Sequence, residues 1–221
     1  MSTGLELDTR SKLLKAAVTV FGKVGYAGAS VRQIADLAGV NHGSIRYHYA
    51  SKRDLWCACI TYLSELMDAA VHQDEAQWAS MTPRERIINV TGHYIRFNAK
   101  NPELHRMVTF ETIHESERFD WLNENYIRPF SGRALASVAL AQEQGVYPDS
   151  IPALNLHYIN IAATTSIFMM ASEVQKNFGV DVFAEIEVER HINAVLTWLL
   201  GAPQVQEKYD FISMLGPKPS E

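Results

Sequence analysis

The chain has 221 residues, 47% of them hydrophobic and 20% charged, with a formal net charge of −5. These values fit a soluble globular protein with one large core, or a small domain joined to a larger one. The N-terminus lacks the apolar core of an export signal, and the longest apolar stretch, residues 158–171, is too short to span a bilayer. Cys57 and Cys59 point to nearly opposite sides of a helix, which disfavours a disulfide or a shared metal. We therefore expect a cytoplasmic protein with no membrane segment.

Charge is divided unevenly along the chain. Residues 1–55 carry eight Lys/Arg and four Asp/Glu, a net charge of +4, whereas residues 56–221 carry twelve and twenty-one, a net charge of −9. A basic head on an acidic body is expected where a small module faces phosphate and the body does not. The sequence predicts two domains, residues 1–55 and residues 56–221.

Four helices are predicted from the N-terminus to the 70s, each marked by cap residues. Short polar residues suit helix N-termini, and glycine suits C-termini. The expected caps are Asp8 and Gly25 for the first helix, Ser30 and Gly39 for the second, Asn41 for the third, and the capping box Ser51–Asp54 for the fourth.

The rest of the chain is also predicted to be helical. The run Thr82-Pro83-Arg84-Glu85 combines a cap, a proline at the first helical position and an acid three residues after the cap. Further helices are expected over about 83–101, from 102 onward, and over 121–143, 153–177 and 182–200. No stretch alternates apolar and polar residues with period two. The predicted fold is all-α, with about nine helices: an N-terminal three-helix domain and a larger C-terminal helical domain.

Residues 9–55 have the order of a helix-turn-helix, which places its second helix in the major groove of DNA. The first residues of that helix suit base edges, and the later ones are long polar groups that suit phosphate. The predicted DNA-binding residues here are Asn41, His42, Gly43, Ser44, Arg46, Tyr47, His48 and Lys52. Packing is the alternative role for Tyr47 and His48, and solvation is the alternative for Lys52. Tyr49 is expected in the core.

A longer pattern runs through the same segment. It consists of Phe21, Gly25-Tyr26, Ala29-Ser30-Val31, Ile34-Ala35, Ala38-Gly39-Val40, Gly43-Ser44-Ile45, Tyr47-His48-Tyr49 and Ser51-Lys52. With this pattern, residues 9–55 resemble the DNA-binding domain of TetR-type transcriptional regulators. The resemblance implies a larger, variable helical domain that binds a ligand and dimerises. By position it adds Ser30 and Arg32 to the DNA contacts; many relatives carry tyrosine where this chain has Arg46.

The C-terminal domain is rich in aromatic residues and methionine, and the resemblance implies an effector enclosed between its middle helices. Core packing is the alternative for each of these residues. The candidate effector contacts are His93, Tyr94, Phe97, Glu111, His114, Tyr126, Phe130 and Asn160. Glu111 and His114 share a helix face, but with no further ligand in view a hydrogen-bonding pair is favoured over a metal site. No metal and no cofactor are expected.

The last two long helices, residues 153–177 and 182–200, are implied to form a homodimer. Small residues there permit close helix approach, and an apolar stripe follows on the second helix. These residues are Ala162, Ala163, Thr164 and Ser166, then Ile192, Val195, Leu196 and Leu199. Burial of the stripe within one chain is the alternative.

The leading hypothesis is a ligand-responsive transcriptional repressor that releases a pseudo-palindromic DNA operator when a small molecule binds. An activator, or a regulator that responds to a protein partner, is the alternative. A helical enzyme such as a hydrolase is a distant third, because the chain contains no G-x-S-x-G, Walker A or H-E-x-x-H motif. We therefore expect no catalytic residues.

Overall fold

The computed structural model describes residues 2–72, 75–114 and 116–201. Over these ranges every regular element is a helix, which confirms the all-α prediction. The elements are α1 (Ser2–Gly28), α2 (Val31–Ala38), α3 (Gly43–His48), α4 (Lys52–Val71), η1 (Glu75–Ser80), α5 (Pro83–Lys100), α6 (Pro102–His114), α7 (Glu117–Leu122), η2 (Asn123–Ile127), α8 (Arg128–Glu143), α9 (Ala153–Met169), α10 (Ala171–Phe178) and α11 (Glu185–Leu200). Among the described residues, no helix is long and apolar enough to cross a membrane.

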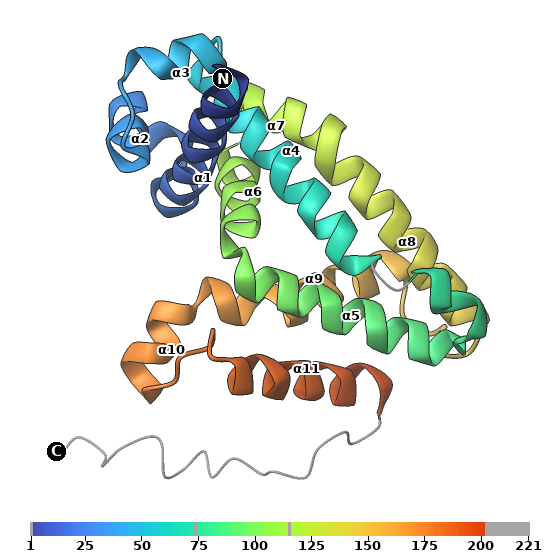
Figure 1. Ribbon diagram of the computed structural model, residues 1–221. Helices are drawn as coiled ribbons and strands as arrows, with labels where there is room; N and C mark the ends of the chain where they lie inside the picture. The colour runs from blue at the N-terminus through green and yellow to red at the C-terminus, as the bar shows by residue number, and fades with distance from the viewer. Residues whose placement is uncertain (1, 73–74, 115, 202–221) are drawn as a thin grey trace, which may run out of the picture. The chain divides into compact units, whose positions relative to one another are not determined.

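The chain forms two compact units (Figure 1). The first unit comprises Met1–Ala69 and Asn101–Gly132, and the second comprises Ala70–Lys100 and Arg133–Glu221. The first unit therefore takes in α6 and α7 beside the N-terminal helices. The functional division at residue 55 remains a prediction.

The predicted caps at Ser30, Gly39 and Ser51 are confirmed. The Ser30 hydroxyl accepts a hydrogen bond from the Gln33 amide at 3.1 Å, and Gly39 ends α2 in the left-handed region at φ 65°. The Ser51 hydroxyl accepts from the Asp54 amide at 3.1 Å and donates to its carboxylate at 2.8 Å, so Ser51 caps the start of α4. Gly25, at φ 69°, breaks the helical path near the end of α1.

The predicted start of the first helix is wrong. α1 begins at Ser2, so Asp8 lies inside the helix and not at its N-terminus. Residues 5–7, Leu-Glu-Leu, are good helix formers, and no proline precedes them, so the helix extends beyond Asp8.

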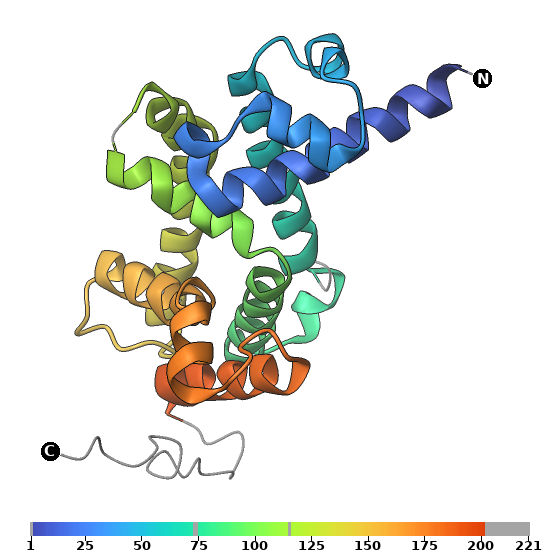
Figure 2. The ribbon, with the colours of Figure 1, turned by 90° about the vertical axis from the view of Figure 1, so that its left-hand side faces the viewer.

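α1 is the scaffold of the first unit. On one side its buried Leu13 and Phe21 belong to the same core as Ile34 of α2 and Ile45 of α3. On the other side α6 crosses its C-terminal half (Figure 2). Gly22 permits this crossing, because a Cβ there would lie 2.5–3.0 Å from atoms of Glu103.

The second unit is built from α5, α9 and α11, with α11 alongside α5 (Figure 1). Thr82 and Glu85 form the predicted capping box at the start of α5, since the Thr82 amide donates to the Glu85 carboxylate at 2.7 Å. Apolar side chains from these helices and the segment before α11 form one core; its buried members are Ile95, Phe168, Val182, Val188, Ile192, Val195 and Leu196. A bidentate ion pair between Arg96 and Glu189, with both bonds at 2.7 Å, joins α5 to α11.

Two predicted helices differ from the structure. The helix expected over 153–177 breaks at Met170, which separates α9 from α10. Just before the break, the hydroxyls of Thr164, Thr165 and Ser166 bond to backbone carbonyls one turn back, a pattern that bends helices. The helix expected over 121–143 is part of a longer helical run from α7 to α8 that contains the π-helical segment η2.

Candidate nucleic-acid interface

The recognition helix α3 is anchored on one side and open on the other. Ile45 is 2% exposed and holds the helix to the core, while Tyr47 is 72% exposed. The other predicted DNA-binding residues are also exposed or half-buried. Ser30, Arg32, Asn41, His42, Gly43 and Arg46 are exposed, and Ser44, His48 and Lys52 are half-buried. Tyr49 is buried, as predicted.

Two of the predicted contacts also shape the motif. Ser30 caps α2, and the Asn41 side-chain oxygen accepts from the Gly43 amide at 2.9 Å at the turn before α3. Each keeps hydrogens that it can donate: Ser30 its hydroxyl hydrogen and Asn41 its amide hydrogens. α3 begins at Gly43, two residues after the predicted cap Asn41.

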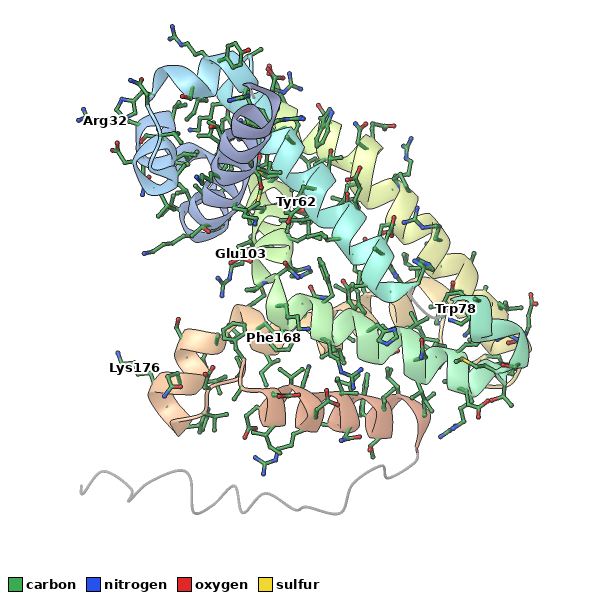
Figure 3. The ribbon with its side chains drawn as sticks, in the orientation of Figure 1. Arg32, Tyr62, Trp78, Glu103, Phe168 and Lys176 are labelled. Atoms are coloured by element: carbon green, nitrogen blue, oxygen red, sulfur yellow. The ribbon has the colours of Figure 1, made fainter. Side chains whose placement is uncertain are left out.

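An acid lies among these residues. The Asp36 carboxylate is 3.0 Å from the His42 Nε2 and 4.0 Å from the Arg32 Nε. Arg32 projects outward from α2 (Figure 3). Asp36 is not among the residues predicted from the sequence, because an acid is not expected on a surface that faces phosphate. Its spacing of four residues from Arg32 was the available signal.

The Lys52 side chain lies against a neighbouring aromatic ring. Its Nζ lies 4.3 Å from the centre of the Tyr26 ring, and the Arg118 guanidinium lies 3.9 Å from the same ring. Burial lowers the pKa of Lys52, and the nearby charge of Arg118 lowers it further. Neither Tyr26 nor Arg118 was predicted to belong to the site, since residue 118 is far from the motif in the sequence.

The helices that form this candidate interface match a known protein family. Residues 13–59 match the family of bacterial regulatory proteins, tetR family. The HTH-type transcriptional repressor NicS of Pseudomonas putida is 28% identical over 153 residues, which cover 65% of this chain and 68% of NicS. The HTH-type transcriptional repressor SCO4008 of Streptomyces coelicolor is 29% identical over 167 residues, which cover 70% of this chain and 75% of that protein. The chain therefore carries the DNA-binding domain of the tetR family of bacterial regulatory proteins.

Solved structures share the fold of this regulator. AibR, in complex with isovaleryl coenzyme A and operator DNA, aligns with a TM-score of 0.69 at 14% identity, over 87% of this chain and 98% of AibR. A mutant of HlyIIR aligns with a TM-score of 0.66 at 19% identity, over 88% of this chain and 98% of that one. At these identities the likeness concerns the fold alone.

Glu111, a predicted effector contact, is committed to neighbours in the first unit of the regulator. Its side chain is 4% exposed, lies 3.0 Å from the Arg118 guanidinium and accepts from the Ser116 hydroxyl at 2.6 Å. The side chain of His114, its predicted partner, lies outside the described part of the structure. Glu111 thus holds the arginine that lies over Tyr26.

The other predicted effector contacts fall into two groups, one in each unit. In the first unit Tyr126 stacks on Phe130 with ring centres 6.0 Å apart, and its hydroxyl lies 3.7 Å from the Met67 sulfur. In the second unit His93, Tyr94 and Phe97 lie on α5 and Asn160 lies on α9.

Asn160 and Tyr94 are the polar members of the second group with the clearest environments. The Asn160 amide donates to the Tyr147 hydroxyl at 3.5 Å, and its side-chain oxygen is buried without a hydrogen-bond partner. Burial raises the pKa of Tyr94 to about 12. Among the described residues, no three His, Cys, Asp or Glu side chains gather in a way that could hold a metal ion.

We predict that Glu111→Gln destabilises the regulator. Loss of the carboxylate leaves Arg118, whose side chain is only 23% exposed, without its charge partner. The free energy of unfolding should fall by about 2 kcal/mol. This is less than the loss on breaking a fully buried ion pair, because Arg118 is partly exposed. Glu124→Gln is the matched control, because Glu124 pairs with Arg128 where both side chains are more than half exposed; its effect should stay under about 0.5 kcal/mol. Urea denaturation measures both, and equal effects would contradict the assigned role of Glu111.

Proposed function

We propose that this regulator is a repressor whose dimer holds a pseudo-palindromic operator and releases it when a small molecule binds. The observation that carries the proposal is the anchored helix α3, which keeps Ile45 in the core and leaves its other side open. Support also comes from NicS and SCO4008, which are named repressors. Because a bacterial regulator meets its operator in the cytoplasm, we place this protein there.

In this proposal α3 enters the major groove with its N-terminal residues at base edges. His42 and Ser44 supply hydrogen-bonding groups there, and Gly43, which carries no side chain, lets the backbone approach the groove. Arg46, with its exposed side chain, contacts phosphate. Lys52 leaves the Tyr26 ring and contacts phosphate from the start of α4.

We predict that Lys52→Ala weakens binding to all DNA sequences alike. One lost phosphate contact should lower the slope of log K against log salt concentration by about 0.9. Lys176→Ala is the matched control, because Lys176 is an exposed lysine of α10 in the second unit and should leave the slope unchanged. Fluorescence anisotropy between about 50 and 200 mM salt measures both slopes. A wild-type slope for Lys52→Ala would mean that Lys52 stays on Tyr26 in the complex.

The dimer face that we propose differs from the one expected from the sequence. Ile192, Val195 and Leu196 are no more than 5% exposed, because they face the core of their own unit. The outer sides of α9 and α11 are apolar too. α9 exposes Leu154 and Tyr158, with Ala162 and Ser166 following at intervals of four, and α11 exposes Ile186, Ala194 and Trp198.

A second copy of the chain fits these outer sides. Reading a pseudo-palindrome needs two heads related by a twofold axis, and a twofold interface pairs the same surface on both chains. Tyr158, 59% exposed, and Trp198, 63% exposed, are of the types that supply most interface energy.

We predict that the double variant Tyr158→Asp, Trp198→Asp is a monomer. Each face would carry two carboxylates, and dimerisation would bury them against those of the partner. The free-energy cost of burying these like charges exceeds the stabilisation from the dimer contact. Light scattering after size exclusion should show the mass falling from about twice to once that of the chain. Leu140→Asp on α8, where Leu140 is 47% exposed, is the control that should stay dimeric. An unchanged mass in the double variant would place the interface elsewhere.

Release of the operator requires a difference in effector affinity between two states. The effector must bind the DNA-incompetent state better, with a coupling free energy of about 1–3 kcal/mol. In the second unit, Asn160 offers a buried acceptor oxygen, and Tyr147, whose pKa burial raises, offers a hydroxyl. A mostly apolar ligand with one hydrogen-bond donor suits these groups.

Repression, as opposed to activation, has a direct test. A reporter gene is placed behind the operator that the purified regulator selects from random DNA. We predict that expression of the regulator lowers reporter transcription, because a dimer on the operator excludes the polymerase. A reporter with scrambled half-sites is the control and should not respond. Increased transcription from the intact operator would support the activator alternative instead.

A further inference from the structure

Asp36 occupies an unusual place for an acid. Its side chain is 64% exposed on α2, and it contacts two residues that we propose for DNA binding, His42 at 3.0 Å and Arg32 at 4.0 Å. A carboxylate between two DNA contacts lies on the same surface as they do. There it opposes phosphate, so it weakens binding to DNA of any sequence.

We propose that Asp36 is a specificity-determining residue that acts through His42 and Arg32. It holds the His42 ring in one orientation for base reading, and it restrains Arg32 from binding phosphate indiscriminately. The inference rests on the proposed function, because it assumes that α3 reads bases. It assigns a role to a residue that carries the opposite charge to that expected of a DNA contact.

The His42 ring is oriented by its hydrogen bond to Asp36. Since a carboxylate only accepts, Nε2 must carry the hydrogen in the 3.0 Å bond to Asp36. The other nitrogen, Nδ1, is then the acceptor in the neutral ring. In the major groove the donors are the amino groups of adenine and cytosine, whereas guanine and thymine present acceptors at the equivalent place. Asp36 thus favours a base with an amino group at the His42 position.

Arg32 is the second residue that Asp36 contacts. Its side chain is 81% exposed, and the 4.0 Å contact with Asp36 is a weak surface pair. Such a pair opens readily where α3 fits its site and the phosphates are well placed. On DNA of other sequence, the carboxylate offsets the positive charge of Arg32. A repulsive group of this kind separates the affinities for right and wrong partners.

The fold does not depend on the Asp36 carboxylate. The cap of α2 uses the backbone of residue 36, whose carbonyl accepts from the Gly39 amide at 3.2 Å. The buried residues of α2 are Ile34 and Ala35, and its N-terminus is capped by Ser30. Asp36→Asn keeps the shape of the side chain and removes its charge, so a change in DNA binding is separable from a loss of structure.

The test is selection from a pool of random-sequence duplexes by the full-length protein. The variants are Asp36→Asn, His42→Ala and the two combined. Glu65→Gln, an exposed acid of α4 outside the proposed contacts, is the charge-matched control. We expect His42→Ala to lose the preference at one base pair of each half-site, and Asp36→Asn to weaken it at the same base pair. The combined variant should match His42→Ala there, because Asp36 acts through His42.

Binding to DNA of random sequence gives the second readout. Asp36→Asn should bind it about fivefold more tightly, with a steeper salt dependence, because Arg32 becomes free for phosphate. Adding Arg32→Ala should remove the steeper dependence. Glu65→Gln should change neither quantity, and circular dichroism should give all variants the wild-type helix content.

The outcomes separate the inference from the proposed function. A wild-type motif that Asp36→Asn leaves unchanged at the His42-dependent base pair would overturn the role of Asp36 alone. Equal changes from Asp36→Asn and Glu65→Gln would do the same, since net charge would then suffice. If the wild-type protein enriches no motif, sequence-specific reading itself fails, and the role of Asp36 fails with it.

Discussion

The proposed function depends on the packing of Ile45 in the core, which holds α3 in place. α3 has six residues and α2 has eight, and helices this short are not stable alone in water. Their geometry comes from their anchors, Ile34 and Ile45, which are almost fully buried, and from Ser30, Gly39 and Asn41 at their ends. Because the anchors face the core, the polar residues of α3 necessarily face outward. The surface offered to DNA is therefore a consequence of how the motif is held.

The same unit connects this motif to helices far from it in the sequence. α6 crosses α1 where Gly22 leaves room for Glu103, and Glu111 near the end of α6 binds Arg118. Arg118 lies over the Tyr26 ring, which also carries Lys52 at the start of α4. These contacts form a continuous physical series from α6 to a proposed phosphate contact. A shift of α6 would change the position of Arg118 and so the balance of two cations on one ring.

Local signals in the sequence were sufficient for four of the caps, but they misplaced the starts of α1 and α3 at Asp8 and Asn41. Ser30, Gly39, Ser51 and Thr82 act through neighbours within four residues, so their chemistry is legible without a fold. Contacts between distant segments were not legible in this way. The pairing of Arg118 with Tyr26 joins residues 92 positions apart, and the Asp36–His42 bond crosses the turn of the motif. The break at Met170 depends on how successive hydroxyls bond to the backbone, which composition does not reveal.

The dimer stripe was misplaced for a different reason. α11 is apolar on two sides, with Ile192, Val195 and Leu196 on one and Ile186 and Trp198 on the other. Helical periodicity identifies both sides but does not say which of them the chain covers itself. Packing against α5 and α9 covers the first side, and the second stays exposed within the described chain. A helix with two apolar sides suits two partners, and the described part of the chain covers only one of those sides. The exposed tryptophan and isoleucine are the side chains through which the proposed dimer would pair this helix with its copy.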